Sequence, residues 1–233
     1  MKKVIMMAAM MMAVISATAQ GRFEPGTLTI QPRIGATAAM LTNAPNLNAA
    51  ELGYSGNIDA TPTGGGFVGV DLEYQIAERL SFSAGANWSN AGSGWENTDF
   101  VEKGGQTVKM RDFKIETEYV FVPMTVNFYI ARGLALKSGV QLGFLTKAKA
   151  KCSLSGGSHG SNMTVDLDED IKDAFNKFDV SIPVGLSYEF KSPFVIDARY
   201  NIGLSKVNKE PMEDGKDTRN GIFTLTFGYK FSL

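Results

Sequence analysis

Residues 194–206 alternate apolar and polar side chains with a period of two, and seven further stretches of the chain follow the same pattern. This period is typical of β-strands, whose side chains point alternately to two faces. An open sheet of such strands would leave an apolar face in water or unpaired edges in lipid, whereas a closed barrel satisfies both faces and all backbone groups. The pattern therefore predicts an all-β fold, an eight-stranded antiparallel transmembrane β-barrel with an up-and-down meander.

The connections between the expected strands are alternately short and long. We expect strands at residues 27–41, 65–75, 80–88, 113–130, 134–151, 179–190, 194–206 and 222–233. Tight turns fall at residues 76–79, 131–133 and 191–193, whereas the segments 42–63, 89–112, 152–178 and 207–221 are long and rich in Gly, Asn, Ser and Pro. Because outer-membrane barrels have short periplasmic turns and long extracellular loops, we expect both termini in the periplasm.

The first residues have the composition of a secretory signal peptide. Lys2 and Lys3 precede twelve apolar residues, and the small residues Ala17 and Ala19 fit a signal-peptidase site before Gln20. Twelve apolar residues are too few to cross a bilayer as a helix, which takes about 20. We therefore expect a signal peptide at residues 1–19 and a β-barrel domain at residues 20–233, in the bacterial outer membrane.

Charge and cysteine content argue against several classes of function. Removing Lys2 and Lys3 from the 23 basic residues leaves 21 against 24 acidic ones, which offers no general basic surface for nucleic acid. Cys152 is the single cysteine and cannot form an internal disulfide. No cluster of His and Cys suggests a zinc site, and the acidic run near residue 168 lacks the Gly and terminal Glu of a calcium loop. We expect no metal and no cofactor.

Charged residues fall at inward positions near the end of the barrel that carries the short turns. They are Arg33, Asp71, Glu73, Lys137, Glu189, Asp197, Arg199 and Lys230, four cations and four anions at similar depth. Charges that face lipid cost several kcal/mol each, whereas charges inside a narrow barrel can pair. A salt-bridged plug is the favoured interpretation of this lumen charge cluster, and a gated pore or proton path is the alternative.

Higher in the barrel the inward residues are small. They are Gly35, Gly69, Ser83, Gly85, Gly139, Gly143, Gly185, Ser187 and Gly203. Small residues can make room for Phe67, Phe121 and Leu145, or they can line a cavity that takes a small ligand. Packing is the favoured interpretation.

The outer mouth combines basic and acidic residues. We expect Lys147, Lys149 and Lys151 to point inward, and Asp166, Asp168, Glu169, Asp170 and Asp173 to lie close to them. A short helix at residues 168–177, with Ile171, Ala174, Phe175 and Phe178 on its buried side, would then cover the mouth as a lid. The alternative is that the lysines contact phosphates of surface lipopolysaccharide or point into water.

Aromatic residues occur where membrane interfaces should lie. Those near the short turns are Tyr74, Tyr129, Tyr188, Phe190, Phe194, Tyr229 and Phe231, and those near the opposite end are Trp88, Trp95 and Phe100. This placement predicts two aromatic girdles.

Catalysis has little support in the sequence. The single histidine, His159, lies in the Gly-rich segment GGSHGSN, where Ser158 and Ser161 are neighbours in sequence but do not make a triad. We expect no catalytic residues. A membrane lipid hydrolase or acyltransferase is the remaining enzyme alternative.

Several segments resemble a known family. Residues 119–129 (YVFVPMTVNFY) and 134–145 (LALKSGVQLGFL) resemble consecutive strands of small outer-membrane barrels of the Bacteroidetes, the PorT-like or OmpA-like β-barrels. Residues 196–207 (IDARYNIGLSKV) and 225–231 (LTFGYKF) are similar to the last hairpin of that family, and the resemblance covers residues 65–233. Phe121 departs from it, since an acidic or polar residue is common there. The resemblance implies the barrel fold and a location in the outer membrane. One branch of the family is linked to protein secretion, but no feature of this sequence assigns the chain to that branch.

Two classes of function remain beside the enzyme. The first is a structural or interaction barrel that meets outer-membrane lipid and, through the loops 42–63, 89–112, 152–178 and 207–221, a protein or surface polymer. The second is a small-ligand-binding or gated transport barrel that uses the Gly-lined interior. The first is favoured, because an eight-stranded barrel is just wide enough for side chains to fill.

Overall fold

A computed structural model describes residues 24–43, 47–48, 57–101, 107–158, 161–209 and 217–233. The expected signal peptide at residues 1–19 lies outside this part of the chain. No helix within the described ranges is long and apolar enough to cross a membrane.

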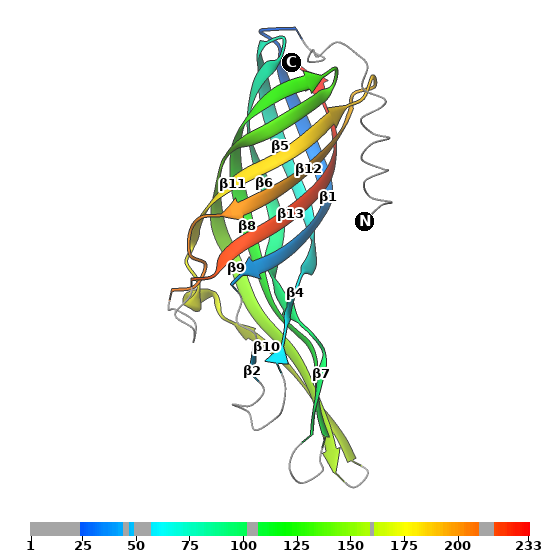
Figure 1. The fold of residues 1–233 in the computed structure, drawn as a ribbon, viewed down its shortest axis with the longest axis vertical. Helices are drawn as coiled ribbons and strands as arrows, with labels where there is room; N and C mark the ends of the chain where they lie inside the picture. Colours follow the sequence, from blue (N-terminus) through cyan, green and yellow to red (C-terminus); the bar gives the residue numbers. More distant parts are fainter. Residues whose placement is uncertain (1–23, 44–46, 49–56, 102–106, 159–160, 210–216) are drawn as a thin grey trace.

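Eight long strands form a closed antiparallel ring (Figure 1), which confirms the predicted fold class. They are β1 (Leu28–Thr42), β5 (Thr63–Ala77), β6 (Leu80–Trp95), β8 (Thr107–Ala131), β9 (Leu134–Ser158), β11 (Phe178–Glu189), β12 (Phe194–Gly203) and β13 (Arg219–Tyr229). Each strand pairs with the next long strand in the chain, and β13 returns to pair with β1.

The ring closes through the first and last strands. β1 pairs with β13 from Arg33 opposite Gly228 to Thr42 opposite Arg219, and with the short strand β14 (Phe231–Ser232) around Ile30. Pro32, which has no N–H to donate, falls between these two paired stretches. Because proline cannot donate to the ladder, the sequence predicts either a bulge or a locally unpaired position here, and the structure has the second.

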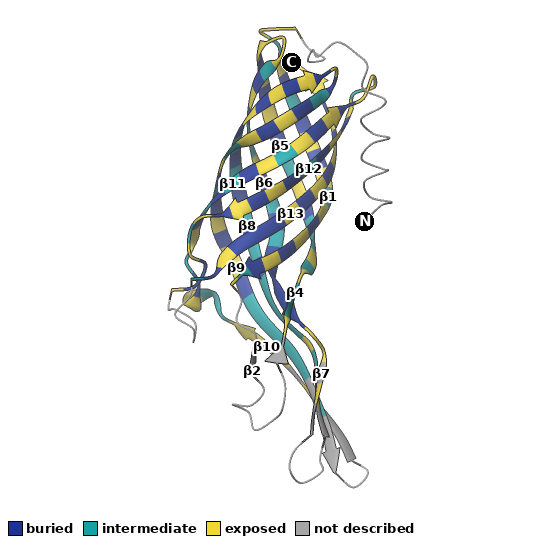
Figure 2. Cartoon of the chain, in the orientation of Figure 1, coloured by how far each residue is buried: buried dark blue, intermediate teal, exposed yellow. Residues whose placement is uncertain are grey.

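Buried and exposed residues alternate along the strands (Figure 2). On β1, for example, Ile34 is 66% exposed whereas its neighbour Arg33 is 3% exposed. Outward positions of the barrel wall are mainly apolar, and inward positions near the short turns are polar or charged. An apolar outer face with polar residues inside is the reverse of the arrangement in water-soluble proteins, and it is the arrangement expected of a barrel wall that faces lipid.

The two ends of the barrel differ. Short turns join β5 to β6, β8 to β9 and β11 to β12, and we call this the short-turn end. At the opposite end, the outer end, β8 and β9 extend well past the other strands because each has 25 residues. With β7 (Thr98–Val101) and β10 (Ser161–Asp170) they form a projecting sheet in the order β7-β8-β9-β10, which we call the outer sheet (Figure 1).

Much of two expected loops is strand. The segment 89–112 contains the end of β6, β7 and the start of β8, and the segment 152–178 contains the end of β9 and β10. Short strands accompany the barrel: β4 (Ala60–Thr61) pairs with β6, and β2 (Leu47–Asn48) and β3 (Asn57–Ile58) form a separate two-stranded sheet.

The expected helix at residues 168–177 is wrong. Residues up to Asp170 belong to β10, and only a 3₁₀ turn, η2 (Lys172–Ala174), follows. Val165, Leu167 and Glu169 alternate with the acidic residues at 166, 168 and 170, and this period of two lets β10 pair with β9 over ten residues.

Candidate functional site

At the short-turn end the lumen is closed by a buried lysine between two glutamates. The Nζ atom of Lys230 lies 3.1 Å from a carboxylate oxygen of Glu73 and also contacts Glu189. The Tyr129 hydroxyl lies 2.8 Å from Glu73 and 2.7 Å from Glu189, and the Ser81 hydroxyl donates to Glu73 at 2.6 Å. These residues come from β5, β6, β8 and β11 and the position after β13, so the network ties together strands around the ring.

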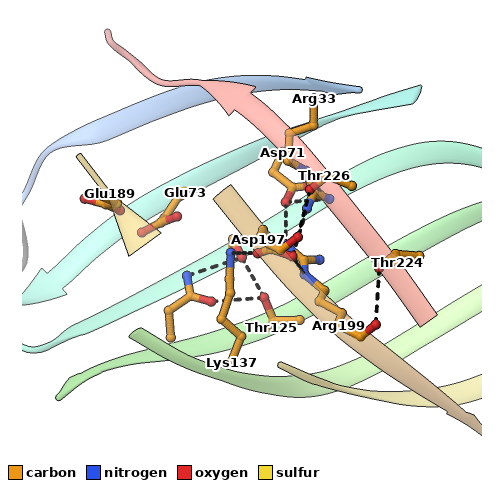
Figure 3. Close-up of polar contacts among 12 residues, drawn as sticks. Arg33, Asp71, Glu73, Thr125, Lys137, Glu189, Asp197, Arg199, Thr224 and Thr226 are labelled. Atoms are coloured by element: carbon orange, nitrogen blue, oxygen red, sulfur yellow. Dashed lines mark hydrogen bonds and ion pairs between the residues drawn. The ribbon is translucent and has the colours of Figure 1, made fainter. Parts of the chain in front are cut away.

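A second ionic cluster lies next to the first, toward the outer end. Arg199 places Nε 2.6 Å from Asp197 and NH2 3.3 Å from Asp71. Arg33 contacts Asp71 at 3.0 Å and Asp197 at 3.6 Å, and Lys137 contacts Asp197 at 3.1 Å. Figure 3 shows these side chains converging from different strands across the lumen. Each carboxylate therefore has at least two cations within ion-pair distance.

The structure brings together all eight residues of the lumen charge cluster, and each is at most 5% exposed. It also adds partners that the sequence did not single out. Tyr129 was expected in an aromatic girdle, but it is 1% exposed and points into the lumen. Tyr129 is two residues from Asn127 and four from Thr125, and both of these side chains point inward. The alternation along the strand could therefore have predicted that Tyr129 points into the lumen.

The lumen above the charges is packed with apolar side chains. Tyr119 and Phe121 stack with ring centroids 5.1 Å apart, and Leu41, Leu145 and Ile222 belong to the same buried cluster. At Gly143, a Cβ atom would lie 2.6 Å from the Phe121 ring, so this glycine makes room for it. At Gly139, a Cβ atom would lie 2.0 Å from the carbonyl oxygen of Met124, so this glycine permits close approach of two strands. Both positions support packing over a ligand cavity.

A hollow of about 410 Å³ lies at the outer end of the wall rather than along the Gly-lined positions. It is lined by Thr42, Asn43, Tyr200, Ile202, Gly203, Asp217, Arg219 and Asn220. Only Gly203 belongs to the small inward set.

The inward direction expected for Lys147, Lys149 and Lys151 is wrong. Tyr119 pairs with Leu145, but the next residue back on β8, Glu118, pairs with Lys147, so Thr146 is an extra residue on β9. This bulge reverses the alternation, because one inserted residue moves every following side chain to the other face. Ala148 is consequently inward and fully buried, and the three lysines are outward.

The outward lysines pair with carboxylates across the outer sheet. Lys147 contacts Glu118 at 3.1 Å, Lys151 contacts Glu116 at 2.6 Å and Lys149 contacts Asp168 at 2.8 Å. The hydrogen bond from Lys149 lowers the pKa of Asp168, and the hydrogen bond to Glu116 raises the pKa of Lys151. The outer sheet therefore carries acidic side chains on β8, basic ones on β9 and an acidic one again on β10.

Of the four expected acidic residues whose side chains the structure describes, only Asp168 meets these lysines. Asp170 accepts a hydrogen bond from the Lys172 backbone N–H, and Glu169 and Asp173 are exposed. The side chain of Asp166 lies outside the described residues. The expected lid of helix and salt bridges is thus replaced by one ion pair between two strands.

Apolar residues close the outer mouth instead. Phe175 is 4% exposed and Val207 is 1% exposed, and both belong to the buried cluster with Leu145 and Ala148. Asn176 fixes this segment, because its backbone N–H donates to Val207 and its side chain donates to the carbonyls of Lys206 and Asn208. Ile171 packs against the cluster, whereas Ala174 and Phe178 are exposed, contrary to the helix expectation.

The residues considered for catalysis are not placed by the structure. His159 and the side chains of Ser158 and Ser161 lie outside the described residues. Within the described ranges, no three His, Cys, Asp or Glu side chains gather in an arrangement that could hold a metal ion.

Comparison with solved structures finds small outer-membrane barrels at low identity. Ail, the attachment invasion locus protein of Yersinia pestis, is 17% identical over 89% of this chain and 99% of that chain, with a TM-score of 0.40. Neisserial surface protein A is 16% identical over 88% and 97%, with a TM-score of 0.39. OprG of Pseudomonas aeruginosa is 13% identical over 94% and 100%, with a TM-score of 0.35.

No curated protein sequence matches the chain. The model of a protein family, described as the outer membrane protein beta-barrel domain, matches residues 18–209. This match spans most of the chain and agrees with the closed ring and its apolar outer face. The chain therefore belongs to the outer membrane protein beta-barrel domain family and is an integral protein of the bacterial outer membrane.

Proposed function

We propose that this protein is a non-enzymatic outer-membrane barrel that acts as a structural or interaction protein through its outer sheet and loops. One observation carries the proposal: buried side chains occupy the lumen both at the short-turn end and above it. Two ionic clusters occupy the short-turn end, and Phe121, Leu145 and Phe175 pack above them. Because eight strands enclose little more than their own side chains, transport through such a lumen is disfavoured.

The orientation of the barrel and the cleavage of its N-terminus are part of the same proposal. We propose that the short turns and both mature termini lie in the periplasm, and that the outer sheet lies outside the cell. The charged N-terminus and the small residues before Gln20 support cleavage after residue 19. The segments at residues 119–129 and 134–145 support the finer assignment to the PorT-like barrels of the Bacteroidetes.

The outer sheet is the surface that we propose for partners, whether a protein or a surface polymer. On the barrel wall, exposed apolar residues are explained by lipid, but Val165 and Leu167 are 41% and 43% exposed on β10, beyond the wall. Within the described residues β10 pairs only with β9. An exposed strand edge with apolar side chains is a ready template for pairing with another chain.

Planar-bilayer conductance tests the closed lumen. We expect the purified full-length chain to give no steady conductance steps under conditions in which a general porin gives them. Steady single-channel steps from the wild-type protein would contradict the proposal and favour the transport alternative.

Crosslinking on intact cells tests the interaction role. We expect a Val165→Ser/Leu167→Ser variant to lose crosslinked partners that the wild-type protein retains, because the apolar side chains of β10 are removed. Glu169→Gln, on the same strand, serves as the matched control and should keep them. Identical crosslinking patterns for all three proteins would exclude β10 as the partner surface.

A further inference from the structure

The hollow at the outer end of the barrel lies on the seam where the first and last strands meet. Its lining includes Thr42 on β1, Tyr200 and Ile202 on β12, and Arg219 on β13, and these three strands are neighbours in the ring (Figure 1). Tyr200 and Ile202 are each 45% exposed, so they belong to the outward face of the wall. The volume of about 410 Å³ falls within the range of small-molecule pockets, roughly 300–1,000 Å³. The hollow is therefore large enough for a ligand and accessible from the outer surface of the barrel.

The outward rows of these strands change from apolar to polar at the level of the hollow. On β13, Phe223 is followed toward the outer end by Gly221 and then by Arg219. On β1, Met40 is followed by Thr42, which pairs directly with Arg219. Because the apolar part of a barrel wall faces the hydrocarbon of the membrane, this change marks the level of the lipid headgroups.

Gly221 allows the Tyr200 side chain to reach this level. Tyr200 pairs with Phe223, yet a Cβ atom at Gly221 would lie only 2.6 Å from the Tyr200 hydroxyl. Gly221 is two residues nearer the outer end than Phe223, so the tyrosine ring leans toward the outer end. The ring presents an apolar face to the lipid, and its hydroxyl lies close to the polar border of the wall.

Arg219 is the cation of the hollow, and it is exposed. Within the described part of the chain, no carboxylate lies within ion-pair distance of its guanidinium, because the acidic residue of the hollow, Asp217, pairs with Lys206 at 2.8 Å. The Thr42 hydroxyl donates to the backbone carbonyl of Arg219 at 3.1 Å. The Asn43 amide donates to the backbone carbonyl of Asp217 at 3.2 Å. These bonds hold the end of β1 against β13, and together Arg219, Lys206 and Asp217 give this rim a net charge of about +1.

We propose that this hollow binds the phosphate group of a phosphorylated glycolipid of the outer leaflet, the lipid A part of lipopolysaccharide, with Arg219 as the main ligand. The guanidinium presents paired N–H donors that match two phosphate oxygens, and the Asn43 amide and Tyr200 hydroxyl are further donors. The apolar faces of Tyr200 and Ile202 pack against an acyl chain of the same lipid. A free phosphate ion would use the donors but would leave these apolar faces without a contact, so the geometry favours a lipid. The proposal rests on the proposed orientation, in which the outer end lies outside the cell.

Native mass spectrometry of the purified full-length protein in detergent tests this proposal. We expect the wild type to retain one diphosphoryl lipid A per barrel, and to bind dephosphorylated lipid A with the same acyl chains about 10- to 100-fold more weakly, because hydrogen bonds to a charged group are lost. Arg219→Gln should weaken the binding of diphosphoryl lipid A by a similar factor. Arg219→Lys keeps the charge but loses the paired donors, so its affinity should lie between the two. Lys109→Gln is the matched control, since Lys109 is exposed on β8, the strand opposite β13 in the ring, and it should bind as the wild type does.

The comparison of the two lipids uses the wild type alone, so it does not require any variant to fold. Equal affinities for diphosphoryl and dephosphorylated lipid A would overturn the proposal, and so would a folded Arg219→Gln variant that binds as tightly as the wild type. Displacement of the lipid by an equal concentration of inorganic phosphate would assign the hollow to a free phosphate ion and overturn the lipid assignment. Because isolated barrels are used, the result depends neither on the orientation in the cell nor on the partners of the outer sheet, whose crosslinking is a separate measurement.

Discussion

Lys230 is the most informative position for testing how the lumen is held closed. Within the described residues it is the single cation within ion-pair distance of Glu73 and of Glu189, and its side chain is 1% exposed. Lys230→Met keeps an unbranched chain of similar length but leaves two carboxylates without a cation. Removing one partner of a buried ion pair costs about 3–5 kcal/mol, and water entering the lumen would reduce this cost. Before that reduction, the folded-to-unfolded ratio should fall by about 10²- to 10⁴-fold.

Urea unfolding followed by gel mobility without boiling measures this change, because a folded barrel and an unfolded chain migrate differently. Lys209→Ala is the matched control, since Lys209 is exposed and its ammonium donates only to the backbone carbonyl of Asp173. We expect its midpoint to stay close to that of the wild type.

A triple variant separates charge from packing. Adding Glu73→Gln and Glu189→Gln to Lys230→Met removes the uncompensated charges and should recover most of the lost stability, as neutral replacements of buried ion pairs often do. Equal midpoints for Lys230→Met and Lys209→Ala would refute the reasoning. A triple variant as unstable as Lys230→Met would show that shape, and not charge, closes this end.

Four further predictions concern the second ionic cluster, the apolar packing above it, the outer sheet and the N-terminus. Arg199→Ala should destabilise the barrel less than Lys230→Met but more than Lys209→Ala in the same urea assay, because Asp71 and Asp197 keep Arg33 and Lys137; a larger loss than for Lys230→Met would contradict this. Gly143→Leu should cost about 1–3 kcal/mol by overpacking against Phe121, and a second change, Phe121→Leu, should restore part of it. The pKa of Asp168 is lowered, so its pairing with Lys149 stabilises β10 above the ordinary aspartate pKa, and this contribution is lost as the pH falls through the lowered value. Proteolysis of β10 should thus increase in acid for the wild type and depend less on pH in Lys149→Gln. N-terminal sequencing of the membrane-extracted protein should begin at Gln20, and an uncleaved chain would exclude the signal peptide.

Most of the barrel could be predicted because the face to which a side chain points depends only on its position within its own strand. The side chains of Phe194, Ile196 and Tyr200 point outward, as their period of two requires, and the same argument placed all eight members of the lumen charge cluster inside. Strand ends were less predictable. The expected third strand ended at Trp88, but β6 continues to Trp95 because its partner β8 extends equally far.

The outer mouth was mispredicted for one specific reason. Counting alternate residues from Leu145 places Lys147 inside the barrel, but Thr146 is inserted as a bulge and reverses the count. A bulge depends on the partner strand, and residues 134–151 alone do not reveal it. The helix prediction for the acidic run fails for a similar reason. Pairing with β9, which lies outside this segment, supplies the backbone hydrogen bonds that make it a strand.

The sequence by itself determined the fold class, the strand number and the burial of the eight members of the lumen charge cluster, because these depend on a side-chain period of two within each strand. Tertiary structure alone decided which charges pair and where the alternation reverses. Those outcomes depend on the register between strands: Lys230 meets Glu73 across 157 positions of sequence, and the Ser205 hydroxyl donates to Asp179 across 26 positions. Register is set by the closure of the whole ring, where bulges, glycines and the stagger of eight strands must fit together.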